Sequence, residues 1–335
     1  FNHVAFYDSV IAKYFSDTAA NFNDYLALPY RKVKSLRYGE NPHQSAALYK
    51  GVDFAKVPVG LVDMVQHSGE DLSYSNILDA DSAFRIVNDF DENTVTIIKH
   101  TNPCGLSNRN KQSEAYTSAY NGDPVSAYGG VVGFNRIVEK ETAVVMKGVL
   151  FDVIIAPGYE DEALEILKKR KRARILSVKG FVNNKIELHS IVGGTLIQTT
   201  DSSQEKYSDW NVASNKLPSK DQISDMEFAW KACKHVKSNS IILVKNKAVI
   251  GLGAGQPNRV NSVHLALRAA GDKAENCVLA SDAFFPFKDS ITMAAENGVS
   301  AIVQPGGSIR DEEVIEVAND CNIVMVCTGV RHFKH

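Results

Sequence analysis

An amine and an imidazole stand side by side after an apolar, β-branched run in this chain. The run is Val95–Ile98, and Lys99 and His100 follow it, ahead of the dipeptide Asn102-Pro103. A strand that ends in these groups and turns at Asn-Pro presents two proton-transfer groups at a sheet edge, where α/β proteins usually keep their chemistry. The pair alone also allows a structural interpretation, because a lysine at a strand end is usually solvated and a histidine beside it often caps a turn.

Three further clusters carry groups that are suited to binding a ligand. One is the segment 37–43, which begins with Arg37 and ends with His43, and another is the C-terminal segment 331–335. The third places three phenylalanines around a proline at 284–287. Strand side chains alternate between two faces, so these rings cannot all be buried on one face. We expect some of them to line a pocket for a flat aromatic ligand.

The elements that must position these groups occur in the same order twice. Each copy has a helix, strands and an acidic helix start, and the clearest match is Ala156-Pro157-Gly158 with Gln304-Pro305-Gly306. Alternating strands and helices predict an α/β fold, here with two related lobes. The expected elements are helices 81–87, 114–120, 160–168, 227–232, 262–270 and 311–318, and strands 95–98, 126–134, 153–158, 240–244, 248–251, 279–287 and 301–307.

The predicted domain organisation has four parts. A junction covers 1–35, the first lobe 36–178, a polar and irregular connector 179–225, and the second lobe 226–335. The chain is long enough for two cores.

Composition excludes several classes of protein. The net charge is −2, and the basic run 168–172 is best interpreted as a solvated helix end, so no nucleic-acid partner is expected. Five cysteines without a CxxC pattern favour a reduced, cytoplasmic protein over a disulfide scaffold. No apolar run approaches the length needed to span a membrane, and no membrane partner is expected.

Two cofactor motifs are matched only in part. The stretch 251–255 reads GxGxG and not GxGxxG, so its glycines more readily serve a close backbone approach than a dinucleotide. A zinc deaminase needs H-x-E and P-C-x-x-C, whereas His100 is followed by Thr101 and Asn102, and Cys104 has no second cysteine. We therefore expect neither a Rossmann site nor a catalytic zinc.

Taken together, the motifs closely resemble the AICAR formyltransferase (transformylase) family, the second half of bifunctional purine biosynthesis enzymes. The resemblance runs over almost the whole chain. The motifs that carry it are 36–44 (LRYGENPHQ), 99–105 (KHTNPCG), 123–130 (DPVSAYGG), 237–239 (KSN), 253–256 (GAGQ), 281–289 (SDAFFPFKD), 304–308 (QPGGS) and 331–335 (RHFKH). The family implies two cytidine-deaminase-like lobes without zinc, in a homodimer whose active sites lie at the interface.

The resemblance implies a reaction and its catalytic residues. The family moves a formyl group from 10-formyltetrahydrofolate to the 5-amino group of 5-aminoimidazole-4-carboxamide ribonucleotide (AICAR), giving FAICAR. That amine is a weak nucleophile, so His100 is similar to the proton acceptor and Lys99 to the group that stabilises the oxyanion or moves a proton. Asn239 resembles an orienting amide, and His335 the family's supporting C-terminal histidine.

The binding residues are also carried over by resemblance. Residues similar to the AICAR contacts are Arg37, Tyr38, Gly129, Asp152, Arg259 and Arg331, with the arginines suited to phosphate. Residues similar to the folate contacts are Tyr128, Phe284, Pro286, Phe287 and Asp289, with the carboxylate accepting from the pterin edge. The family also allows for a structural monovalent cation.

The chain departs from the family pattern in two places. Glu70 stands where bacterial relatives usually have lysine, which reverses a charge near the nucleotide pocket. No segment matches the IMP cyclohydrolase domain, so no ring-closing activity is expected from these residues. Two rival hypotheses stay open: a zinc-dependent base deaminase on the same fold, and a nucleotide-binding module that has lost turnover.

Overall fold

A computed structural model describes residues 1–15, 22–52, 60–181 and 186–335, and these residues form two compact units. The first, which we call the hairpin unit, comprises Phe1–Val65, Asp71–Ile77 and Val178–Ser203. The second, the sheet unit, comprises Gln66–Glu70, Leu78–Ser177 and Gln204–His335.

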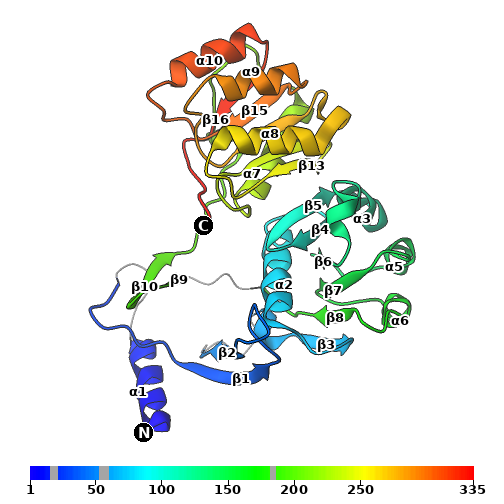
Figure 1. Ribbon diagram of the computed structural model, residues 1–335, viewed down its shortest axis with the longest axis vertical. Helices are drawn as coiled ribbons and strands as arrows, with labels where there is room; N and C mark the ends of the chain where they lie inside the picture. The colour runs from blue at the N-terminus through cyan, green and yellow to red at the C-terminus, as the bar shows by residue number, and fades with distance from the viewer. Residues whose placement is uncertain (16–21, 53–59, 182–185) are drawn as a thin grey trace. The chain divides into compact units, whose positions relative to one another are not determined.

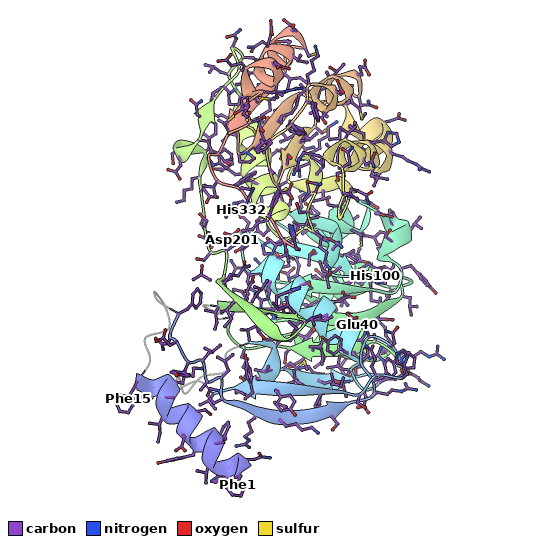
Figure 2. All side chains as sticks on the ribbon, turned by 60° about the vertical axis from the view of Figure 1, so that its left-hand side comes forward. Phe1, Phe15, Glu40, His100, Asp201 and His332 are labelled. Carbon is purple, nitrogen blue, oxygen red and sulfur yellow. The ribbon has the colours of Figure 1, made fainter. Side chains whose placement is uncertain are left out.

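The described residues of the hairpin unit include helix α1 and two antiparallel strand pairs. Helix α1 (Asn2–Phe15) has no buried residue, and Figure 2 labels Phe1, which precedes the helix, and Phe15, its last residue. Strand β1 (Tyr30–Leu36) pairs with β2 (Ala46–Gly51), and the 3-10 turn η1 (Leu61–Asp63) follows. Strand β9 (Ile186–Ile191) pairs with β10 (Gly194–Thr199), inside the segment that the sequence analysis expected to be irregular.

The sheet unit contains one mixed sheet of 12 strands, which confirms the predicted α/β class (Figure 1). The strand order is β11-β16-β15-β14-β12-β13-β5-β4-β6-β7-β8-β3. The strands of its first half are β3 (Val65–Ser68), β4 (Thr94–Lys99), β5 (Asn102–Asn108), β6 (Gly130–Phe134), β7 (Phe151–Ala156) and β8 (Arg174–Ser177). Those of its second half are β11 (Asn211–Val212), β12 (Ile241–Lys245), β13 (Ala248–Gly253), β14 (Val278–Ser281), β15 (Ala301–Gln304) and β16 (Val324–Cys327).

The same order of pairing occurs in both halves of the sheet. Strand β4 pairs antiparallel with β5 and β6, and parallel pairs β6–β7 and β7–β8 follow. Strand β12 pairs antiparallel with β13 and β14, and parallel pairs β14–β15 and β15–β16 follow.

The helices are α2 (Tyr74–Val87), α3 (Gln112–Tyr120), α4 (Pro124–Ala127), α5 (Lys140–Val145) and α6 (Asp161–Lys168), then α7 (Lys220–Cys233), α8 (Arg259–Ala270), η3 (Gly271–Ala274), α9 (Asp289–Glu296) and α10 (Asp311–Asp320), with the short turn η2 (Tyr207–Asp209).

Local sequence explains where several helices begin. Helix α7 starts at a capping box in which Ser219 accepts from the N–H of Gln222 and the Gln222 side chain accepts in return. Helices α6 and α10 carry carboxylates in their first turns, as expected from the helix dipole.

Each half of the sheet also has its own apolar cluster, one around Phe134 and Phe151 and the other around Phe285. Burying one such ring contributes about 1.5–3 kcal/mol.

A narrow joint connects the two halves of the sheet. Strands β5 and β13 share one bridge, Ala248 to Ser107, and move apart beyond it. Away from the strands, the Asp89 carboxylate binds Lys234 at 2.8 Å and His235 at 2.5 Å. The joint is therefore held by ion pairing as well as by backbone pairing.

Candidate functional site

The predicted site residues of the sheet unit lie along one edge of the 12-stranded sheet. In the first half this edge holds the end of β4 and the amino ends of β6 and β7, because Ile98 pairs with Val131 and Gly130 with Phe151. Strand β13 runs antiparallel to β5, so the same edge holds the start of β12 and the ends of β14, β15 and β16. Lys99, Tyr128, Gly129, Asp152, Asn239, Arg259, 284–289 and 331–335 all stand at or next to these strand ends.

Lys99 and His100 lie at a tight reversal between β4 and β5. The chain turns at His100 and Thr101, which have φ values of 53° and 63°, and not at Asn102-Pro103 as the sequence had indicated. Two successive positive φ values are typical of a type I′ hairpin turn, a conformation that residues other than glycine seldom adopt and that is costly for β-branched threonine. The position of these residues therefore depends on contacts from outside the turn.

Asp79 of α2 supplies such a contact. Its Oδ1 accepts a hydrogen bond from the backbone N–H of Thr101 at 2.7 Å. Burial raises the pKa of the Asp79 carboxyl; the Thr101 N–H and the charge of His100 oppose this shift, and the charge of Asp152 adds to it. Asp79 thus connects helix α2 to the turn and lies in electrostatic range of two predicted site residues.

The Lys99 ammonium is directed to the segment that precedes β6. Its Nζ donates to the carbonyl of Tyr128 at 2.6 Å. The next residue, Gly129, has φ 72° and donates its N–H to the carbonyl of Leu150, just before β7. A Cβ on Gly129 would meet nothing within 4 Å, so its positive φ is what favours glycine here. The structure therefore brings Lys99, Tyr128 and Gly129 together.

The half-buried Asn239 and the buried Arg259 belong to one hydrogen-bond network. The Asn239 amide donates to the carbonyl of Gln256 at 2.7 Å and accepts from Arg259 Nη2 at 2.6 Å. Arg259 Nη1 donates to Ser281 Oγ at 2.9 Å and to the carboxylate of Asp282. Only 6% of Arg259 is exposed, and the guanidinium that the sequence assigned to phosphate is hydrogen-bonded to Asn239, Ser281 and Asp282 of its own chain.

The phenylalanine-rich segment divides between core and surface. Phe285 is fully buried, whereas Phe284 and Phe287 are 37% and 50% exposed. Pro286 is half-buried, and Asp289 is exposed at the first residue of α9. The exposed rings and the carboxylate thus remain accessible to a ligand, while Phe285 anchors the segment.

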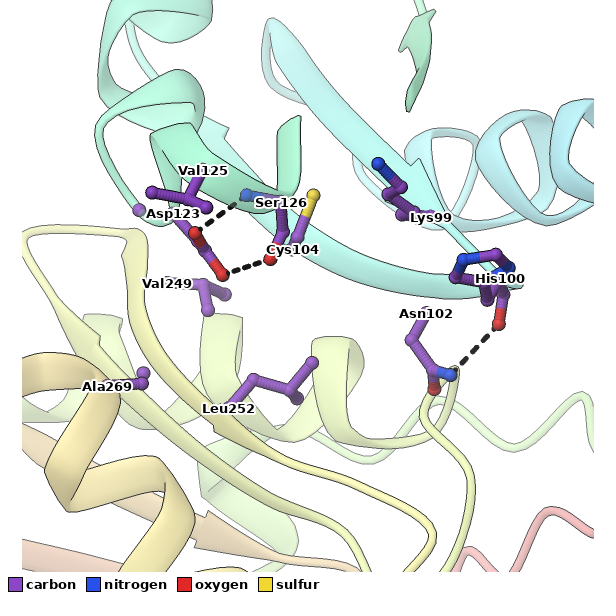
Figure 3. A pocket seen from close by; sticks show the side chains of 12 residues that line it. Lys99, His100, Asn102, Cys104, Asp123, Val125, Ser126, Val249, Leu252 and Ala269 are labelled. Atoms are coloured by element: carbon purple, nitrogen blue, oxygen red, sulfur yellow. Dashed lines mark hydrogen bonds between the residues drawn. The ribbon is translucent and has the colours of Figure 1, made fainter. Parts of the chain in front are cut away.

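A pocket of about 460 Å³ opens between the diverging strands β5 and β13 (Figure 3). On the first half it is lined by Lys99, His100, Asn102, Cys104, Asp123 and Ser126, and on the second by Val249, Leu252 and Ala269. Asp123 accepts from Ser126 N–H at 2.9 Å and from Ser126 Oγ at 2.5 Å. The pocket therefore combines polar groups from one half with an apolar wall from the other.

Arg37 and Tyr38 belong to the hairpin unit, directly after β1. The Arg37 guanidinium lies 5.6 Å from the centre of the Tyr38 ring. Their predicted role in nucleotide binding remains a prediction.

The structure adds residues that sequence reasoning did not single out. Asp79 fixes the turn, and Asn102 and Asp123 line the pocket. The last two stand inside motifs that carried the resemblance, whereas Asp79 lies on a helix with no visible chemical pattern. Glu70, the residue that departs from the family, pairs with Arg174 of β8 at 3.2 Å.

Within the described ranges, no group of three or more His, Cys, Asp or Glu could hold a metal ion, and no helix is long and apolar enough to cross a bilayer.

Comparisons with known proteins agree on one family. Residues 1–269 match the family model described as AICARFT/IMPCHase bienzyme. The chain is 45% identical over its whole length to the bifunctional purine biosynthesis protein PurH of Oceanobacillus iheyensis, of which it covers 66%. It is 46% identical over 91% of its length to the protein of the same description from Dictyostelium discoideum, of which it covers 58%. The chain thus spans just under two thirds of the length of the Oceanobacillus relative.

Proposed function

Because the chain belongs to the AICARFT/IMPCHase bienzyme family, we propose that it transfers the formyl group of 10-formyltetrahydrofolate to the 5-amino group of AICAR. The observation that carries the proposal is the Lys99–His100 pair. A turn anchored by Asp79 holds the pair at a pocket on the same sheet edge as the other predicted site residues of the sheet unit.

The chemistry of the pair suits this reaction. The AICAR amine attacks the formyl carbon and forms the new C–N bond, and His100 accepts the proton that the amine loses. Lys99, fixed by the Tyr128 carbonyl, stabilises the charge on the formyl oxygen and delivers a proton to the folate nitrogen as its C–N bond breaks. General-base help of this kind contributes roughly 10²–10⁴-fold.

The residues that we propose to bind the nucleotide are those named by the resemblance to the family. Arg37 and Arg331 supply cations for the phosphate, and the exposed Asp152 accepts from ribose hydroxyls. Gly129 and Tyr38 provide close contacts. We assign Arg259 mainly to holding Asn239, whose amide then orients the substrate carboxamide or His100.

The folate is bound by the segment after β14 together with Tyr128. Asp289 accepts two hydrogen bonds from the 2-aminopyrimidinone edge of the pterin. Phe284, Pro286, Phe287 and Tyr128 form the apolar walls, in keeping with the exposure of three of these rings (Tyr128 is 61% exposed).

We further propose that the two halves of the sheet are deaminase-like lobes that arose by duplication, in keeping with their matching strand pairings. The predicted boundaries 36–178 and 226–335 stand as part of this proposal, as does a cytoplasmic homodimer with its active sites at the interface. A structural monovalent cation also fits one observation: Oδ2 of the buried Asp282 has no hydrogen-bond partner within the described residues. Such a cation would contact the Oδ2 oxygen, while Arg259 pairs with the other oxygen of the carboxylate.

A folate-difference assay with AICAR tests the proposed activity. The protein is mixed with AICAR and 10-formyltetrahydrofolate, and the release of tetrahydrofolate is followed by absorbance while FAICAR is identified by mass. Turnover that requires both substrates and survives chelation of zinc supports formyl transfer. Binding of AICAR without turnover would instead identify a silent nucleotide-binding module.

A further inference from the structure

The last seven residues run along the functional edge of the sheet. Thr328 and Gly329 donate backbone N–H groups to the carbonyls of Gln304 and Pro305, at the end of β15. Further along, His332 N–H donates to the carbonyl of Asp282, just after β14, and the Lys334 carbonyl accepts from Ser238 N–H, just before β12. The tail 329–335 therefore crosses the ends of β15 and β14 and stops beside Asn239.

Side chains of the tail alternate between two directions. Arg331, Phe333 and His335 are exposed, and they form a row in which the Arg331 guanidinium lies 4.2 Å from the Phe333 ring centre. The Phe333 and His335 rings are 5.6 Å apart. An extended backbone places alternate residues on one face, so the two predicted site residues of the tail, Arg331 and His335, share the outward face.

The inward face of the tail carries its anchors. His332 is 2% exposed, and its Nε2 lies 3.1 Å from Oε2 of Glu205. The same carboxylate oxygen accepts from Trp230 Nε1 at 3.1 Å, and the Trp230 and His332 rings lie 5.0 Å apart. Lys334 adds a hydrogen bond from its Nζ to the carbonyl of His235 at 3.2 Å.

We propose that His332, held by Glu205 and packed on Trp230, is a positioning residue that fixes the tail so that Arg331 and His335 face the site. The tail has no helix or strand of its own after β16, so its direction depends on these contacts. The proposal rests on the proposed function for the roles of Arg331 and His335. The anchor itself rests only on the contacts of His332, and it is tested separately from activity.

The test replaces His332 by phenylalanine, which keeps an aromatic ring against Trp230 and removes the bond to Glu205. Loss of a buried hydrogen bond to a charged group predicts a fall of about tenfold in kcat. The Ser238 amide, which bonds the tail, should exchange its hydrogen about tenfold faster, while the neighbouring Asn239 amide, which bonds Gln256, keeps its rate. The matched control is His264→Phe on the exposed face of α8, which should change neither quantity.

A double mutant separates positioning from general damage. In a chain that already carries His335→Ala, His332→Phe should lower kcat by less than about twofold further, because both changes act through the tail. Full multiplication of the two effects, or unchanged exchange at Ser238, would overturn the proposal. Faster exchange at Ser238 with unchanged activity of His335→Ala would uphold the anchor and refute the role proposed for His335.

Discussion

The carboxylate of Asp79 holds the backbone N–H of Thr101 at 2.7 Å and thereby fixes a turn whose two central residues both have positive φ. One of these residues is His100. The contact joins α2, which has no predicted role in the chemistry, to the pair proposed to move protons.

Replacing Asp79 by alanine should therefore lower turnover more than it lowers substrate binding. Without the acceptor, the strained turn relaxes and His100 moves, and we expect kcat to fall about 10–100-fold with KM for AICAR within about threefold. Asparagine keeps an oxygen that can accept from Thr101, so Asp79→Asn should retain most of the activity. Steady-state kinetics of the three proteins test this, and equal kcat values for alanine and parent would refute it.

Removal of the C-terminal His335 should lower activity without unfolding the protein. The side chain is exposed and packs only against Phe333 among the ring contacts of the described chain, so its loss removes little stability. We expect a fall in kcat of about tenfold and a melting temperature within about 2 °C of the parent. Unchanged kinetics in the shortened chain would show that the tail ends outside the site.

The joint between the halves should make stability depend on pH. Burial opposes ionisation of Asp89, but bonds and charges from His235 and Lys234 hold its pKa well below the ordinary 3.8. A carboxyl with a depressed folded-state pKa stabilises the fold above its unfolded pKa, and this stability is lost as the pH falls below about 4. Burial also lowers the pKa of His235 from 6.5, which acts in the same direction at higher pH.

Asp89→Asn should consequently cost about 2–4 kcal/mol of unfolding free energy at pH 7. The difference from the parent should shrink as the pH falls below about 4, where the parent loses the ionised carboxylate. Denaturant titrations at pH 7, 5 and 3 measure it. A constant difference across this range would contradict the ionised pair.

Cys104 should be unreactive although it lines the pocket. Burial, with a smaller contribution from the charge of Asp123, raises the pKa of its thiol to about 12. At pH 8 the thiolate fraction is then smaller than that of an ordinary cysteine by a factor of about 10³, so alkylation should be slowed to a similar degree. The exposed Cys321 should react first, and Cys321→Ser should abolish the fast phase. Rapid labelling of Cys104 would contradict this environment.

The sequence predicted the elements with strong local patterns. The β-branched run at 95–98 became β4, the stretch 153–158 overlaps β7, and the acidic helix starts at 161 and 311 were found. Long-range relationships were not accessible in the same way. The single bridge between Ser107 and Ala248 that makes one sheet of two halves leaves no local signal, and neither does the Asp79 contact.

In the candidate site, too, local patterns were predictable from the sequence and long-range contacts were not. Residue types and motifs led to the prediction of Lys99, His100 and Asn239 as site residues, and the topology places these three residues on one edge of the sheet. They did not reveal that Arg259 is buried against Asp282, because a lone arginine after a glycine loop has the same appearance whether it binds a phosphate or a carboxylate of its own chain. The position of the turn also differs from the prediction. The hairpin pairing of β4 with β5 places the turn at His100 and Thr101, whereas the local preference of Asn-Pro had indicated residues 102 and 103.

The central claim is that Lys99 and His100 act in the transition state of formyl transfer, and single-turnover kinetics of Lys99→Ala and His100→Ala test it most directly. Each variant should lose two or more decades in the rate of FAICAR formation. Its affinity for AICAR, measured by calorimetry in the same preparations, should stay within about tenfold of the parent. Near-parental rates in both variants would contradict the account.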